Sequence, residues 1–255
     1  HADGIIYVPT ERASTPAGTN SILYALDAAT GNQRWEFSDP DALKFNQASV
    51  SDGIVVVTVN SLVDGGAGAY AFDSVSGDLM WEFTEDDGIN RPAVIGNSIA
   101  ILHSLPWVWG VDLQSGAILW EVLGTSAGGG IAMGPEIAYI GFEDELRAVN
   151  PVDGSTRWSA PVSGIAGPPT VTSGLVYTGV WRRGDEREPH MLHAFDASSG
   201  TVSDAEPMSD PFSAADPGSP AHLRVIPDTT SASLTFVDAD ALRIYRRDWP
   251  ERPFR

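Results

Sequence analysis

The amino-acid sequence predicts an all-β fold, a β-propeller of four-stranded antiparallel blades with about six blades visible. Three observations support this prediction. One short motif recurs five times, apolar β-branched runs precede its copies, and no segment combines a 3.6-residue apolar period with helix-capping residues. We expect residues 1–255 to form a single propeller domain, with seven or eight blades if further sequence belongs to the ring.

The recurring motif consists of an acid or amide anchor, a glycine four residues later and a tryptophan eight residues after the anchor. The anchors are Asp27, Asp73, Asp112, Asn150 and Asp196, the glycines are Gly31, Gly77, Gly116, Gly154 and Gly200, and the tryptophans are Trp35, Trp81, Trp120 and Trp158. Successive anchors lie 46, 39, 38 and 46 residues apart, a period typical of propeller blades. The glycine supplies the positive φ of a tight turn. In the fifth copy, Asp204 replaces the tryptophan.

Each blade is expected to contain four strands, named A to D in chain order. The runs 53–59, 97–102, 136–141 and 174–179 have the β-branched, apolar composition of strand B. The Ala-x-Asp segment then forms strand C, the glycine lies in the turn, and the tryptophan lies on strand D. A weaker sixth unit is predicted from 234–237 and 241–245, with no glycine turn or tryptophan of this pattern after it.

Composition excludes several classes of function. The chain has 34 acidic residues against 15 Lys and Arg, a net charge of −19, which argues against nucleic acid and anionic lipid surfaces as partners. Because there is no cysteine, the chain has no disulfide, thiol nucleophile or cysteine-ligated metal. No apolar run approaches the length of a membrane span. The sequence begins at His1 rather than Met, so we expect a targeting segment to have been removed.

The pattern Ala-x-Asp-x-x-x-Gly-x-x-x-Trp resembles the tryptophan-docking repeat of propellers related to quinoprotein alcohol dehydrogenases, here called PQQ-like propellers after pyrroloquinoline quinone. The resemblance extends from about Gly4 to Tyr245. It implies that the four motif tryptophans pack between neighbouring blades and are structural. The group includes PQQ-dependent enzymes and non-enzymatic proteins typified by the lipoprotein of the bacterial outer-membrane assembly machine. A fold of this kind hosts many functions, so the motif predicts fold more specifically than activity.

The enzymes of this group imply a Ca²⁺ held by Glu, Asn and Asp, an aspartate base, an arginine near the quinone and often a vicinal disulfide. The disulfide is impossible in a chain without cysteine. The candidate acids Asp238, Asp240 and 85–87 are better interpreted as a hairpin turn and a solvated loop, because most carboxylates cover the surface. We therefore predict no catalytic residue, metal or cofactor. PQQ with Ca²⁺ is retained as the alternative.

Other chemical motifs are weaker still. His103 and Ser104 end a predicted strand B, but no nucleophile elbow surrounds them. His190 and His193 are three residues apart, which places them on opposite faces of a strand unless His190 lies in the loop. The glycines of 128–130 are not followed by the lysine of a phosphate loop, and we expect them to let two backbones pass closely.

The long loop after the fifth strand B is the predicted partner site. It begins with Trp181, Arg182 and Arg183, residue types that are enriched at binding hot spots. The alternative is that the two arginines pair with Asp185, Glu186 and Glu188 in the same loop. Closure of the propeller also points to a partner. The first blade has no strand A in the sequence, and prolines weaken the C-terminal tail as a central strand, so the tail, further residues or a partner strand would complete the seam.

These features favour a non-enzymatic interaction or assembly scaffold that works outside the cytoplasm of a bacterium, in the periplasm, at the cell surface or in secreted form. The location is implied by the resemblance. The partner would be a protein, with no nucleic acid and no direct membrane span. Two alternatives stay open: a fragment of a PQQ-dependent dehydrogenase, and a ligand-sensing propeller domain of a membrane receptor or kinase.

Overall fold

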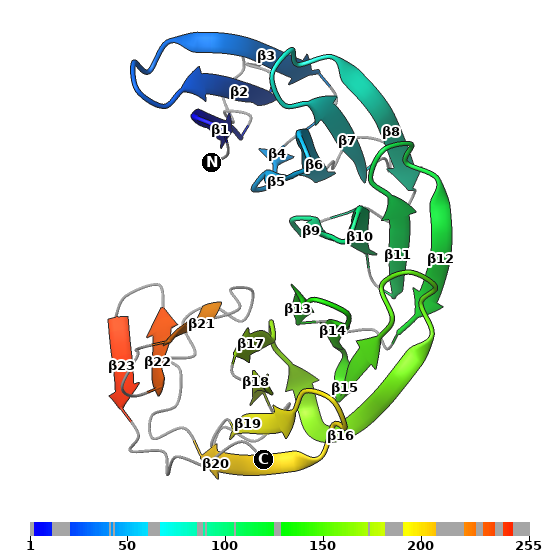
Figure 1. The fold of residues 1–255 in the computed structure, drawn as a ribbon, viewed down its shortest axis with the longest axis vertical. Coiled ribbons are helices and arrows are strands. Elements are labelled where there is room, and N and C mark those ends of the chain that lie inside the picture. Colours follow the sequence, from blue (N-terminus) through cyan, green and yellow to red (C-terminus); the bar gives the residue numbers. More distant parts are fainter. Residues whose placement is uncertain are drawn as a thin grey trace. The chain divides into compact units, whose positions relative to one another are not determined.

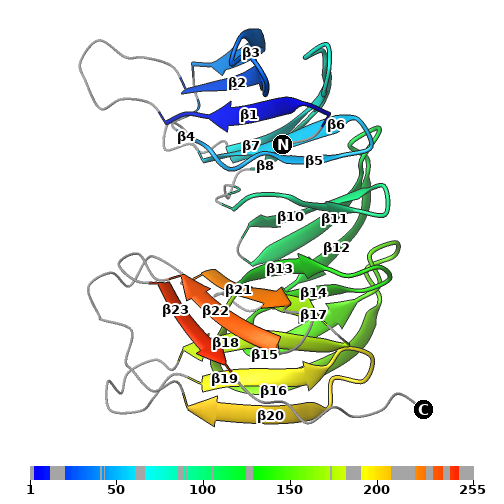
Figure 2. The same cartoon turned by 60° about the vertical axis from the view of Figure 1, so that its left-hand side comes forward.

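The computed structural model describes a protein built from antiparallel β-strands (Figures 1 and 2). The described residues are 3–11, 21–40, 42, 44–60, 67–85, 89, 91–104, 106–124, 129–172, 174–181, 191–207, 222–227, 232–237 and 242–246. The chain divides into two compact units. The first comprises residues 1–124 with 151–154, and the second comprises 125–150 with 155–255. The prediction of a single domain stays a prediction.

The first unit contains three sheets. Its strands are β1 (Ile5–Pro9), β2 (Ser21–Asp27), β3 (Gln33–Asp39), β4 (Lys44–Phe45), β5 (Ser49–Ser51), β6 (Ile54–Asn60), β7 (Ala67–Asp73), β8 (Leu79–Glu85), β9 (Val94–Gly96), β10 (Ile99–Ser104), β11 (Trp107–Asp112) and β12 (Ile118–Leu123). The sheet orders are β1-β2-β3, β4-β6-β7-β8 with β5 beside β6, and β9-β10-β11-β12. We call these sheets blades 1, 2 and 3. Strands β3, β8 and β12 are their outer strands (Figure 1).

The second unit continues the same strand order. Its strands are β13 (Gly130–Met133), β14 (Ala138–Gly141), β15 (Glu143–Val149), β16 (Thr156–Ala166), β17 (Thr170–Thr172), β18 (Leu175–Trp181), β19 (Met191–Asp196), β20 (Val202–Pro207), β21 (His222–Pro227), β22 (Ala232–Val237) and β23 (Leu242–Arg246). Blade 4 is β13 to β16 and blade 5 is β17 to β20. They join into one sheet where the end of β16 pairs with β18. The order β21-β22-β23 forms the weaker unit predicted from the sequence.

Alternating burial explains why these segments form strands. In β2, Leu23 and Ala25 are fully buried while their neighbours Ile22, Tyr24 and Leu26 are half-buried. Period-two alternation gives each strand two faces, and apolar area on one or both faces drives packing against adjacent sheets. Among the described residues, hydrophobic clusters lie between blades 1 and 2, between blades 2 and 3, and between blades 4 and 5.

A β-bulge recurs at one position of every motif-bearing blade. The register between strands C and D shifts at Ala25/Leu26, Ala71/Phe72, Gly110/Val111, Ala148/Val149 and Ala194/Phe195. The extra residue lies immediately before the motif tryptophan, as Arg34 does before Trp35, and before Asp204 in the fifth copy. The bulge places each tryptophan opposite a small residue of strand C, for example Trp81 opposite Ala71. A bulge therefore helps to determine the face on which each indole projects.

Glycine allows two backbones to approach in the second unit. A Cβ on Gly129 would lie 1.7 Å from the Ala166 carbonyl oxygen, and one on Gly141 would lie 2.7 Å from the same atom. The amide of Gly129 donates to the carbonyl of Gly141, and the amide of Gly167 donates to that of Gly179. The structure confirms for Gly129 the close passage of backbones predicted from the sequence; Gly128 lies outside the described residues.

Candidate functional site

The motif tryptophans donate hydrogen bonds to the next blade. The indole Nε1 of Trp35 lies 3.2 Å from the Ser74 carbonyl oxygen, and that of Trp81 lies 2.8 Å from Leu113 O. The corresponding distances are 2.7 Å from Trp120 to Pro151 and 3.0 Å from Trp158 to Ala197. Each acceptor is the residue directly after the anchor of the following copy. These acceptors could not be predicted from the sequence, because every residue type has a backbone carbonyl group.

The motif glycines lie directly against the same indoles. A Cβ on Gly77 would be 2.7 Å from a Trp35 ring atom, and one on Gly116 would be 2.7 Å from Trp81. The distances from Gly154 to Trp120 and from Gly200 to Trp158 are 2.8 and 2.5 Å. These glycines have φ between 69° and 78°, so they serve two purposes. They permit the left-handed turn, and they leave room for the ring.

The anchor carboxylates hold the turn that carries each glycine. Asp73 Oδ1 accepts from the amides of Val75 and Ser76, and Asp112 Oδ1 accepts from the amide and hydroxyl of Ser115. Hydrogen bonds to the ionised form lower a carboxyl pKa. The amides of Ser76 and Val75 lower the pKa of Asp73, and the Ser115 hydroxyl and amide lower the pKa of Asp112.

Two further anchors show the same effect with different partners. Arg34, whose Nη2 lies 2.6 Å from Asp27 Oδ2, is the main cause of the lowered pKa of Asp27, followed by the hydroxyl and amide of Thr30. The hydroxyls of Ser198 and Ser199 lower the pKa of Asp196. The anchors are therefore acceptors inside their own turns.

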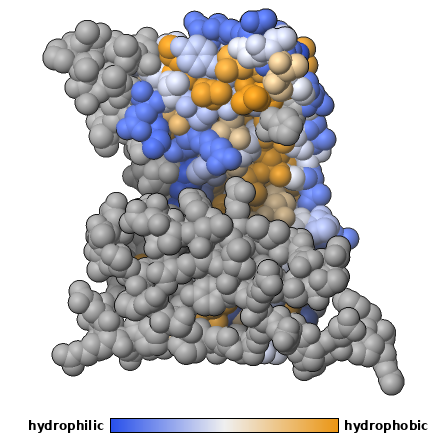
Figure 3. All heavy atoms as spheres, turned by 90° about the vertical axis from the view of Figure 1, so that its left-hand side faces the viewer, coloured by the Kyte–Doolittle hydropathy of each residue, from blue (hydrophilic) through white to orange (hydrophobic). Residues whose placement is uncertain are grey.

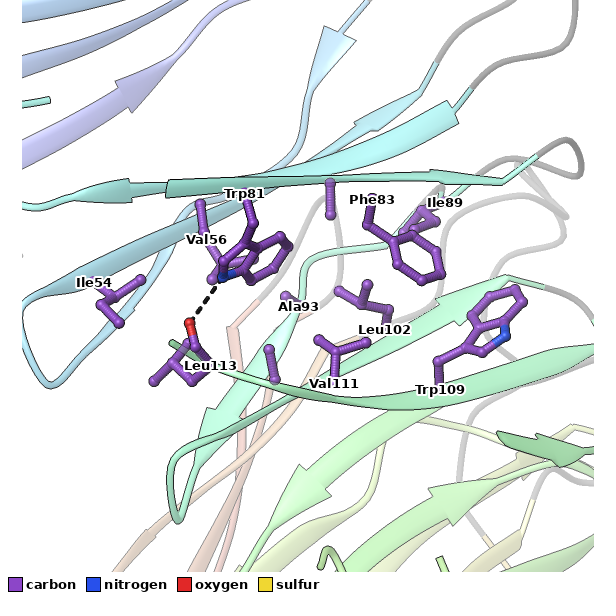
Figure 4. Packing of buried hydrophobic residues seen from close by; sticks show 13 residues of the cluster. Ile54, Val56, Trp81, Phe83, Ile89, Ala93, Leu102, Trp109, Val111 and Leu113 are labelled. Carbon is purple, nitrogen blue, oxygen red and sulfur yellow. Dashed lines mark hydrogen bonds between the residues drawn. The ribbon is translucent and has the colours of Figure 1, made fainter. Parts of the chain in front are cut away.

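Figure 4 shows how an indole completes the apolar interface between blades 2 and 3. Trp81 projects from β8 toward Leu113, with its hydrogen bond dashed, while Phe83 of the same strand faces Trp109 of β11. The Phe83 and Trp109 ring centroids are 5.5 Å apart. Trp81 is 7% exposed and Leu113 is 1% exposed, so the polar contact is sealed by apolar side chains.

Comparison with solved structures identifies the architecture. The chain is similar to BamB from Moraxella catarrhalis, with a TM-score of 0.56, 15% identity, and coverage of 95% of this chain and 88% of that one. It is also similar to quinohemoprotein alcohol dehydrogenase from Comamonas testosteroni, with a TM-score of 0.57 and 14% identity over 92% of this chain and 50% of that one. The fold is that of a PQQ-like β-propeller.

Other comparisons add little about activity. The computationally designed Ika8 protein matches with a TM-score of 0.58 and 12% identity, covering 97% of this chain and 82% of that one. Residues 175–247 match a family model described as a domain of unknown function, DUF7485. A search of curated proteins finds no match. At these identities the similar structures show the fold alone. The chain spans half the length of the quinohemoprotein alcohol dehydrogenase that it matches.

One buried polar group stands apart from the docking motif. His103 on β10 is 2% exposed, and neither ring nitrogen has a hydrogen-bond partner among the described residues. The hydroxyl of the neighbouring Ser104 is likewise buried and unpartnered there. Burial lowers the pKa of His103 to about 4, with a smaller contribution from the charge of Arg91. The sequence singled out His103 and Ser104, but it gave no signal for Arg91. Alternation along β10 places the two side chains on opposite faces, so they do not form one catalytic pair.

The residues predicted to bind a partner or a metal lie mostly outside the described part of the chain. The backbone of Trp181 ends β18, while Arg182, Arg183 and His190 lie beyond it in 182–190, which is not described. The candidate acids Asp238 and Asp240 and residues 86–88 are also outside. In the described ranges, no group of three or more His, Cys, Asp or Glu residues could hold a metal ion, and no helix is long and apolar enough to cross a membrane.

Proposed function

We propose that this PQQ-like propeller is a non-enzymatic scaffold that binds another protein outside the cytoplasm of a bacterial cell. One observation supports this most directly: the repeated polar groups are engaged within the fold. The carboxylates of Asp73 and Asp112 accept hydrogen bonds from their own turns, and the indoles of Trp81 and Trp120 donate to the next blade. A scaffold built in this way leaves its loops and unpaired faces for binding.

A fragment of a PQQ-dependent dehydrogenase is the second candidate. It is favoured by the likeness to a quinohemoprotein alcohol dehydrogenase, of whose length this chain spans half. The described residues do not fit such a centre, because they contain no cluster of metal-ligating side chains, and the whole chain lacks the cysteines of a vicinal disulfide. Location outside the cytoplasm rests on the resemblance to the PQQ-like propellers.

Native mass spectrometry of the protein, gently isolated from the cells that produce it, tests the proposal. We expect a complex in which a second polypeptide accompanies this chain. The contrary result is a mass increase of a bound quinone, together with reduction of an artificial electron acceptor when PQQ, Ca²⁺ and a primary alcohol are added. A soluble ligand that raises the melting temperature with no second polypeptide present would instead favour the sensor alternative.

A further inference from the structure

The outer strand of blade 3 begins with exposed apolar side chains. Ile118 and Leu119 of β12 are 56% and 48% exposed, and Val152 is 62% exposed. Trp120 links the three residues, because it directly follows Leu119 and its indole donates to the carbonyl of the residue before Val152. All of them belong to the first unit, which includes residues 151–154. We call Ile118, Leu119 and Val152 the β12 patch.

The β12 patch lies at the turn end of its sheet. Ile118 is paired next to the turn of blade 3, whereas Leu123 is paired at the opposite end of the same hairpin. Residue 105 and residues 125–128, which the structure does not describe, adjoin blade 3 at that opposite end. The length of β12 therefore separates them from the patch.

Comparison with blade 4 shows that the fold does not require apolar side chains at these positions. The residues equivalent to the patch are all polar and exposed there, although Trp158 makes the same hydrogen bond to the next turn: Thr156, Arg157 and Ser198. Hydrophobic side chains also reach the surface on another side of the molecule (Figure 3), so exposure alone does not identify a site. The contrast between equivalent positions is what distinguishes the β12 patch.

Strand β12 is also a poorly protected edge. It ends the sheet order of blade 3, and no described strand pairs with its outer side (Figure 1). Edge strands of natural proteins usually carry charges or prolines that discourage pairing with other chains. Arg34 on β3, Arg157 and Pro161 on β16, and Pro207 on β20 fit this rule. The sequence of β12, ILWEVL, has Glu121 as its one charged residue and contains no proline.

The charge around the patch is negative. Blade 3, taken as residues 94–123, contains no lysine or arginine, and its acidic residues are Asp112 in the turn before β12 and Glu121 on β12 itself. Asp153 directly follows Val152 and is exposed. Because complementary charge steers encounter and suppresses wrong partners, a segment that covers this patch should be basic.

We infer that β12 receives an extended segment of another protein as an added strand, whose apolar side chains cover the β12 patch and whose lysine or arginine side chains face Glu121 and Asp153. This inference rests on the proposed function and names the surface and the chemistry of the partner. In strand addition, main-chain hydrogen bonds supply affinity and side chains supply specificity. Burial of exposed apolar area adds to the affinity.

Two other occupants fit the observations less well. Pairing of β12 with a second copy of this chain would bring together two acidic surfaces of proteins with a charge of −19. A small ligand has little reason to prefer this surface, because small-molecule sites are concave and bury most of the ligand, whereas β12 is the outer strand of a sheet.

Site-specific photocrosslinking in the producing cells tests the inference. A benzophenone amino acid replaces Ile118 in the full chain, and a control protein carries it at Gln33, the equivalent exposed residue of β3. After irradiation, crosslinked peptides are identified by mass spectrometry. We expect the Ile118 probe to capture a segment of a different polypeptide that combines apolar residues with lysine or arginine, and the Gln33 probe not to capture it.

A matched pair of arginine variants tests the contact. The captured segment is synthesised as a peptide, and its binding to the full chain is measured by fluorescence anisotropy. Leu119→Arg introduces the residue that blades 1 and 4 already carry at the same bulge, so the fold should accept it. Gln33→Arg makes the same change of charge on β3. We expect Leu119→Arg to weaken binding roughly tenfold, the scale of losing one good contact, and Gln33→Arg to leave it unchanged.

Amide hydrogen exchange distinguishes an added strand from side-chain contact alone. The peptide should slow exchange of the amides of β12 and leave those of β3 unchanged. The same peptide methylated at every backbone nitrogen keeps its side chains and charge but loses its N–H donors, so it should not bind.

Each other outcome overturns the inference. Equal crosslinking from Ile118 and Gln33, capture of an acidic segment, or capture of a second copy detected by isotope labelling would show that β12 selects no basic partner strand. Equal effects of the two arginine variants would show that net charge alone governs binding, and binding of the methylated peptide would exclude strand addition. These results would leave the scaffold proposal standing, because a partner could bind elsewhere, whereas quinone-dependent turnover would overturn the scaffold proposal.

Discussion

Gly116 lies so close to the ring of Trp81 that an added Cβ would be 2.7 Å from its Cγ atom. The two residues belong to different copies of the motif, so the glycine of one blade is matched to the tryptophan of the preceding one. Gly116 has a φ of 72°, which a side chain adopts only with strain. The glycine therefore has two constraints, one set by its turn and the other by the docked indole.

Comparison of two alanine substitutions separates these constraints. Gly116→Ala should be more destabilising than Gly174→Ala, because Gly174 has a φ of 77° with nothing within 4 Å of the added carbon. We expect both to incur about 1–2 kcal/mol of left-handed strain. Gly116→Ala should lose about 1–3 kcal/mol more by overpacking against Trp81. Urea unfolding measures the difference, and equal losses would contradict the assigned contact.

Substitution of Trp81 tests the interface between blades 2 and 3. Trp81→Phe removes the donor to Leu113 and leaves that buried carbonyl unsatisfied, which should lower the free energy of unfolding by about 1–3 kcal/mol. Trp81→Ala should lower it by about 3–5 kcal/mol, because a cavity is added. The control Leu119→Ala changes an exposed side chain and should stay within about 0.5 kcal/mol of wild type. A Phe variant as stable as wild type would show that the hydrogen bond contributes nothing.

The anchor aspartates should make the protein sensitive to acid. The pKa of Asp112 is lowered in the folded state, so its stabilising contribution is present above the unfolded pKa of about 4 and is lost as the pH falls through the folded value. Asp112→Asn keeps an acceptor oxygen but does not titrate. We expect this variant to lose less stability below pH 4 than wild type.

The fourth copy provides the reciprocal control for this experiment. Its anchor is Asn150, so Asn150→Asp should steepen the loss of stability below about pH 4. Acid titration followed by circular dichroism reports both variants. If Asp112→Asn and wild type showed the same acid profile, the turn carboxylate would not be linked to unfolding.

His103 should control stability over a separate pH range. Its pKa is about 4 in the folded state, below the ordinary histidine value of about 6.5, so the unfolded chain binds a proton first as the pH falls. Wild-type stability should then decrease from about pH 6.5 to 4 by up to about 1.4 kcal/mol per pH unit. His103→Leu should remove this slope. The other histidines are present in both proteins and cancel in the comparison. Parallel profiles would contradict the burial of a neutral imidazole.

Much of the fold was predictable because its determinants are local. An anchor acceptor, a glycine with positive φ and β-branched runs act within a few residues, and they repeat at a nearly constant period. Turn and strand positions could therefore be predicted from five copies of one pattern. The acceptor carbonyls at Ser74 and Leu113 could not, since every residue carries a carbonyl and only the docked blade selects one. The burial of His103 could not be predicted either, because its neighbours in the sequence do not indicate which side chains cover it.

Gly31 and Gly77 show the difference between what the local sequence determines and what tertiary packing determines. Both follow an anchor aspartate by four residues, and their φ values are 72° and 78°. The sequence by itself determined these two turns, because backbone sterics and hydrogen bonds within four residues define them. Only the tertiary structure decided that Gly77 lies beneath Trp35, whereas a Cβ on Gly31 would meet no atom of the described residues within 4 Å. The indole reaches Gly77 from a strand about 40 residues earlier in the chain, so its position depends on how the blades pack rather than on the motif.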